Sequence, residues 1–192
     1  MGNKYARPSP LDRYRAGEED ALEDILWSIC APLFDLALHL FHSRRVAEDE
    51  VAAALRKLAD EVRAGAMPGD SPGAAAARHL SRSLVRAPDA GDVADIPFEH
   101  GADPIALMRS LSELSPSRWS LLAHAHALDL EGEEWRTALS LVPEQALAEV
   151  EDIIAGLGVE RSTLRAFMDA RAARANVPHG LVERALASEE ES

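Results

Sequence analysis

The stretch LEDILWSICAPLFDLALHL, residues 22–40, decides the fold class of this chain. Its large apolar residues recur at steps of three and four, and an α-helix of 3.6 residues per turn gathers such residues on one face. Those residues are Leu22, Ile25, Leu26, Ile29, Leu33, Leu36 and Leu40. Pro32 interrupts this face, so we expect the helix to break or kink near Cys30.

Outward from this stretch, the same helical spacing recurs and no strand pattern competes with it. Leu and Ala dominate the composition, which favours helix over sheet. Glycine- and proline-containing segments separate the periodic runs. The sequence therefore predicts an all-α fold, with further helices at 51–62, 74–86, 104–113, 117–129, 132–141, 144–156, 161–175 and 179–188.

These helices group into two small bundles joined by a linker. We expect a disordered leader at 1–10, a first helical domain at 11–86 and a second at 104–157. Residues 87–103 combine prolines and glycines with five carboxylates and lack helical periodicity, which is typical of an acidic linker. Residues 158–192 form a C-terminal helical extension, which we expect to pack on the rest of the chain.

The composition limits the classes of partner. The formal net charge of −13 over 192 residues argues against general affinity for nucleic acid or anionic membranes and favours a basic partner. The single cysteine, Cys30, excludes an intramolecular disulfide, fits a reducing compartment and is expected to be a small buried hydrophobe. We see no signal peptide before Leu11 and no uncharged apolar run near the ~18 residues of a membrane span. These features predict a cytoplasmic protein without membrane contact.

Two parts of the chain, 11–86 and 104–155, resemble a known family in the order and spacing of short motifs. The motifs are LDRYRAGEEDAL at 11–22, APLF at 31–34, LAL at 36–38, VAEDEV at 46–51, LSP at 114–116, LL at 121–122, LEGEEW at 130–135 and AL at 138–139. Together they are similar to the extracytoplasmic-function sigma factors. This resemblance implies a first domain that docks on core RNA polymerase, a second domain with a helix-turn-helix, and promoter reading by both.

Three surfaces that the resemblance implies are changed in this chain. Polar positions of the polymerase-docking helix correspond to Ala52 and Ala53, and the promoter-melting stretch, at 74–83, lacks its tryptophan. The would-be reading helix, 143–154, contains no Lys or Arg. Since cations supply the phosphate affinity of a DNA-reading helix, we expect direct DNA binding to be weak or absent. In their place this helix carries Glu144, Glu149, Glu151 and Asp152.

We therefore interpret the chain as a sigma-like regulator of transcription that acts through protein contacts, either as a decoy for an anti-sigma factor or by binding another regulator. The four carboxylates would form an acidic partner surface. Arg78, Arg82 and Arg86 stand four apart and would form a basic stripe for DNA or an acidic partner. Alternatives are a working divergent sigma factor on core RNA polymerase and an unrelated helical adaptor or immunity-type protein.

One internal arrangement also stays open. The acidic helix either faces solvent or folds against the arginine-rich tail. In the second case Arg161, Arg165 and Arg171 would neutralise part of the 149–152 face. Autoinhibition would then be possible.

The sequence gives little indication of a catalytic site or a metal site. His124 and His126, two apart on a predicted helix, point to different sides and cannot easily share a metal. His39 and His42 could share one, but no cysteine or acidic ligand set stands near them. Nucleophile motifs, phosphate loops and dinucleotide fingerprints are missing. We expect neither an enzyme nor a cofactor or metal.

Overall fold

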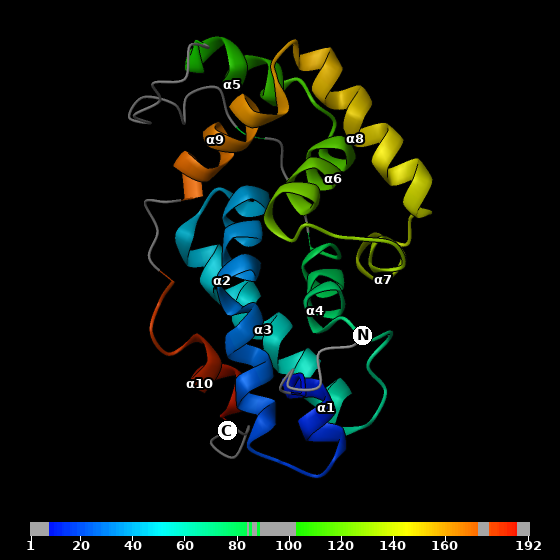
Figure 1. Ribbon diagram of the computed structural model, residues 1–192. Coiled ribbons are helices and arrows are strands. Elements are labelled where there is room, and N and C mark those ends of the chain that lie inside the picture. The colour runs from blue at the N-terminus through cyan, green and yellow to red at the C-terminus, as the bar shows by residue number, and fades with distance from the viewer. Residues whose placement is uncertain (1–7, 84, 86–87, 89–102, 173–176, 188–192) are drawn as a thin grey trace.

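The computed structural model describes residues 8–83, 85, 88, 103–172 and 177–187. Within these residues the protein has ten α-helices and no strand, which confirms the predicted all-α class (Figure 1). The expected leader lies outside the described residues up to residue 7, and the expected linker does so except for Pro88 and Asp103. The helices are α1 (Pro10–Arg15), α2 (Ala21–Phe41), α3 (Arg44–Arg63), α4 (Pro72–Leu80), α5 (Pro104–Ser112), α6 (Pro116–Ala127), α7 (Glu134–Leu139), α8 (Pro143–Leu157), α9 (Arg161–Ala172) and α10 (Leu181–Leu186).

Helix α2 continues through Pro32, so the expected break near Cys30 is wrong. A proline inside a helix removes one backbone hydrogen bond and costs about 3 kcal/mol. Burial offsets this penalty, because Ile29, Cys30, Leu33 and Phe34 on both sides of Pro32 are all buried. Cys30 is the buried hydrophobe that the sequence predicts, and burial raises the pKa of its thiol to about 11.

Two other helices are shorter than expected. Helix α4 ends at Leu80 rather than near residue 86, and the Ser81 hydroxyl at its end donates to the carbonyl of Ala77 (2.9 Å). Helix α7 begins after Gly132, at φ +45°, and ends at Ser140, at φ +59°. The short polar side chain of a residue such as Ser81 hydrogen-bonds backbone groups at a helix end, and glycine readily adopts positive φ. Apolar spacing alone does not show either effect.

The two halves of the chain pack against each other through α2 and α4. Helix α2 contacts α6, and α4 contacts α7 (Figure 1). The buried Trp119 of α6 donates its indole N–H to the carbonyl of His39 in α2 (2.9 Å). Buried residues of both halves belong to one hydrophobic cluster. The predicted division into two bundles stays a prediction, but the structure joins the halves by a shared core.

The C-terminal extension folds back onto the chain, as expected. Helix α9 contacts α2, whereas α10 packs on α3 and α2. Arg184 of α10 donates to the carbonyl of Glu48 (3.3 Å), and Arg56 of α3 donates to the carbonyl of Arg184 (2.9 Å). The two helices of the extension therefore cover different parts of the molecule.

Among the described helices, α2 is long and apolar enough to span a membrane by length and composition. Half of its most apolar window is buried inside the fold. The same pattern occurs in central core helices, and α2 contacts α1, α3, α4, α6, α9 and α10.

Candidate functional site

The acidic surface lies on α8, which follows α7 after a three-residue turn. The turn begins at Ser140 in the left-handed region and reaches the extended residue Val142, where α8 starts with Pro143. Figure 1 shows α7 nearly end-on while α8 crosses the view, so the two axes cross steeply. Ala146, Val150, Ile153 and Ile154 bury the inner face of α8. The helix-turn-helix reading of this region stays a prediction.

All four predicted carboxylates of α8 are exposed. Arg118 of α6 binds two of them: its Nε donates to Glu149 (2.7 Å) and its Nη2 donates to Asp152 (2.8 Å). Sequence reasoning missed Arg118, because it lies 31 residues before Glu149 and only tertiary packing brings them together. Among the described residues, Glu144 forms no ion pair.

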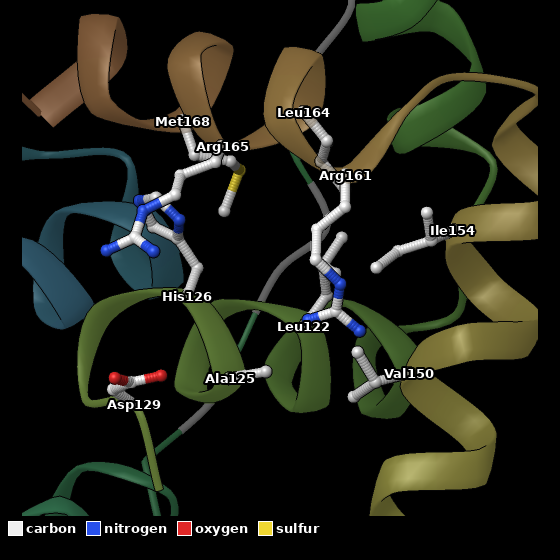
Figure 2. A pocket seen from close by; sticks show the side chains of 10 residues that line it. All are labelled: Leu122, Ala125, His126, Asp129, Val150, Ile154, Arg161, Leu164, Arg165 and Met168. Carbon is white, nitrogen blue, oxygen red and sulfur yellow. The ribbon is translucent and has the colours of Figure 1, made fainter.

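The arginine-rich tail neutralises one carboxylate of α8. Arg161 of α9 forms an ion pair with Glu151, as one arrangement of the sequence predicts. Arg165 does not join it: its side chain lies beside His126 at the edge of a small cleft of about 70 Å³ between α6, α8 and α9 (Figure 2). The side chain of Arg171 lies outside the described part of the chain. Two cations therefore face four carboxylates, and α8 remains acidic.

Apolar side chains interrupt the acidic surface. Leu147 is 51% exposed at the middle of α8, and Val142 is 38% exposed at its start. Leu147 lies one turn from Glu144 and from Glu151, since residues three or four apart share a helix face. We call the exposed residues Glu144, Leu147, Ala148 and Glu151 the α8 face. The α8 face thus combines one exposed leucine with a carboxylate one turn away on each side.

The expected basic stripe does not form one helix face. Arg78 is inside α4 and donates to Glu61 of α3 (2.5 Å), while Arg82 lies in the turn after α4. Arg86 lies outside the described residues. The reason is the early end of α4 at Leu80, which places Arg78 inside the helix and Arg82 after it. His79 lies 3.1 Å from the same Glu61 oxygen, and burial lowers its pKa against the opposing effect of that carboxylate.

The helix α6 histidines point to different sides, as the sequence predicts. His124 is fully buried, with Nδ1 2.7 Å from the carbonyl oxygen of Ser120 and Nε2 2.9 Å from the hydroxyl of Ser81. Burial lowers the pKa of His124 to about 4, so the ring is neutral at pH 7. His126 instead faces Asp169 of α9 (3.3 Å). Within the described ranges no cluster of potential metal ligands is found.

The position that would dock on polymerase is partly covered. Ala52 is buried and Ala53 is exposed on α3. Arg184 of α10 lies across this segment, bonded to the carbonyl of Glu48 and 3.6 Å from the carboxylate of Asp49. Helix α10 therefore occupies the face of α3 that precedes Ala52 and Ala53.

The chain matches no family model, no curated protein and no solved structure.

Proposed function

We propose that this protein is a helical interaction module that regulates transcription through protein contacts made by the α8 face. Its partner would be a basic protein segment with an apolar residue for Leu147, such as an anti-sigma factor or another regulator. The observation that carries the proposal is the residual acidity of α8: four carboxylates, two arginines that are already bonded to them, and an exposed leucine at the centre. Such a surface repels phosphates and attracts cations.

The position of α10 supports protein contacts other than polymerase. By the resemblance to sigma factors, the segment around 48–53 of α3 would dock on core RNA polymerase. Here Arg184 is bonded across it. A polymerase that used this face would first have to displace α10.

The second candidate is a divergent but working sigma factor. The observation that favours it is Arg82, which is exposed and has no ion pair among the described residues. Arg78 does not add to it, because Glu61 already neutralises its charge. An unrelated adaptor remains the third candidate, and the core shared by both halves fits it equally well.

Gel filtration with purified candidate partners separates these functions. The protein is mixed in turn with core RNA polymerase and with anti-sigma factors from its own source. We expect separate elution from polymerase and co-elution with an anti-sigma factor. Leu147→Asp should abolish that co-elution, because it removes the apolar centre of the α8 face and adds a charge.

Ile105→Asp is the matched control, since Ile105 is a 59% exposed apolar residue on α5. It should leave complex formation unchanged. Co-elution with polymerase would favour the second candidate. Binding to neither partner would contradict the proposed role in transcription. An equal loss of complex formation in both variants would contradict a role of the α8 face in binding.

A further inference from the structure

A cleft lies between the end of α4, helix α6 and the end of α7. Its volume is about 580 Å³, within the range of small-molecule sites. Residues of both halves of the chain line it, from the ends of α4 and α7 and from α6. These three helices lie near one another in Figure 1. It lies apart from the α8 face: neither Leu147 nor any of the four α8 carboxylates lines it.

One side of the cleft is suited to an anion. Arg78 and Arg82 line it, and Arg82 has no ion pair among the residues that the structure describes. Among the described residues that line the cleft there is no carboxylate. Two carboxylates bind lining residues: Glu61 is paired with Arg78, and Glu50 accepts from the hydroxyl of Ser83. Since Glu61 neutralises Arg78, Arg82 is the described lining cation that is left for an anion in this cleft.

Hydroxyl and backbone donors complete this side. Ser117 lines the cleft at the second position of α6, where a helix leaves its N–H groups without intrahelical partners. Ser140 lines it from the end of α7 at φ +59°, a conformation that glycine adopts with less strain. Left-handed residues other than glycine occur often at ligand sites. A guanidinium, a helix N-terminus and hydroxyl groups are the donors that phosphate groups prefer.

Apolar side chains also line the cleft, among them Leu121, Leu139 and Leu141. A bare phosphate would leave this surface exposed. We propose that the cleft binds a small phosphate monoester with an apolar or aromatic body, its phosphate held by Arg82, Ser117 and Ser140 and its body on the leucines. Bound there, it ties the end of α4 to α6 and α7.

A buried group of polar side chains adjoins this cleft. Nε2 of His124 lies 2.9 Å from the hydroxyl oxygen of Ser81, and its Nδ1 lies 2.7 Å from the carbonyl oxygen of Ser120. Ser81 and Ser120 both line the cleft. This network links α4 to α6, so the site is formed before binding and needs little ordering.

Calorimetric titration with phenyl phosphate tests the proposal directly. We expect saturable binding with a Kd below about 1 mM. Inorganic phosphate lacks the apolar body and phenol lacks the charge, so each should bind at least about tenfold more weakly. Arg82→Ala should weaken phenyl phosphate binding by about tenfold or more, and Arg109→Ala, an exposed arginine on α5, should leave it unchanged.

Ser140→Gly separates binding from folding. It relieves the positive φ, so the Tm should stay the same or rise, while the loss of the hydroxyl weakens binding. Leu147→Asp should leave phenyl phosphate binding intact, which keeps this site distinct from the α8 face. Absence of saturation at about 10 mM ligand overturns the proposal. So does unchanged affinity in Arg82→Ala, or equal affinity for inorganic phosphate or phenol.

Discussion

At the scale of single residues, two buried polar side chains connect the halves of the chain. Trp119 reaches from α6 to the backbone of α2, and His124 reaches from α6 to Ser81 at the end of α4. Buried polar groups are stable only when they are hydrogen-bonded, so each contact requires a specific partner. These two residues make the register between the halves specific, whereas the surrounding leucines and alanines mainly supply buried area.

His124 predicts a pH dependence of stability. Its folded pKa of about 4 lies below the unfolded value of 6.5, so between these values the unfolded chain binds more protons. Stability is therefore complete above about pH 6.5 and falls as the pH drops toward 4, by on the order of 3 kcal/mol. Burial also lowers the pKa values of His79 and His126, which act in the same direction.

Urea unfolding at several pH values measures this effect. In His124→Gln, the free energy of unfolding should change much less between pH 6.5 and 4 than in the wild type. An NMR titration of the wild-type His124 ring provides a second readout should the variant fold poorly. A ring that titrates near pH 6.5, or a variant with the wild-type slope, would contradict the assignment.

The buried position of Trp119 predicts that its replacement lowers stability more than replacement of an exposed tryptophan. Trp119→Phe removes a buried indole and its hydrogen bond to His39, so we expect a loss of about 1–3 kcal/mol in the free energy of unfolding. Trp27 is 41% exposed and bonds Glu23 on the surface, so Trp27→Phe should change stability by less than about 0.5 kcal/mol. Equal effects in chemical denaturation would rule out the linking role of Trp119.

At the scale of elements, apolar spacing locates the helices but not their ends or their neighbours. The periodicity of 144–156 predicts α8 closely, because Ala146, Val150, Ile153 and Ile154 all face inward. The end of α4 depends on Ser81, and the course of α2 through Pro32 depends on burial against other helices. The ion pairs of α8 come from Arg118 and Arg161 on α6 and α9, and no local pattern contains that information. For the same reason the basic stripe, a local inference, is wrong.

Because the ion pairs of Arg118 are exposed, we expect replacement of Arg118 to change stability only slightly. The side chains of Arg118 and Glu149 are 39% and 46% exposed, so solvent screens their interaction. Arg118→Ala should lower the free energy of unfolding by less than about 1 kcal/mol, and added salt should reduce the difference. It should strengthen binding of a basic partner to the α8 face, because Glu149 and Asp152 become uncompensated.

Thermal unfolding at two salt concentrations checks the stability part, with Arg136→Ala as the control, since Arg136 forms an exposed pair with Glu133. A loss of several kcal/mol in Arg118→Ala would mean that the pair is structural rather than a surface feature.

At the scale of the whole molecule, packing joins segments that the sequence suggests are separate. Sequence reasoning places a boundary at 87–103, yet α2 contacts α6, α4 contacts α7, and α10 returns to α3. Composition and periodicity report on local structure, and contacts between residues 80 or more positions apart leave no such trace. The all-α class was therefore predictable, while the cleft between α4, α6 and α7 was not.

The shared core predicts cooperative unfolding. In the Trp27→Phe variant, the fluorescence of Trp119 and Trp135 reports on the second half of the chain, whereas far-UV circular dichroism reports on all helices. The two signals should give one coincident transition in urea, because unfolding either half exposes the core of the other. Two separated transitions would show that the halves unfold independently.

We infer that the acidic surface of α8 contacts a protein partner and does not read DNA. Fluorescence anisotropy of a labelled DNA duplex, titrated with the protein at about 50 mM and about 200 mM salt, tests it most directly. We expect no saturable binding at either salt concentration, because the exposed side of α8 carries carboxylates and its neighbouring arginines are bonded to them. Saturable binding at low salt that weakens steeply at high salt would contradict it and would make the protein a nucleic-acid-binding one.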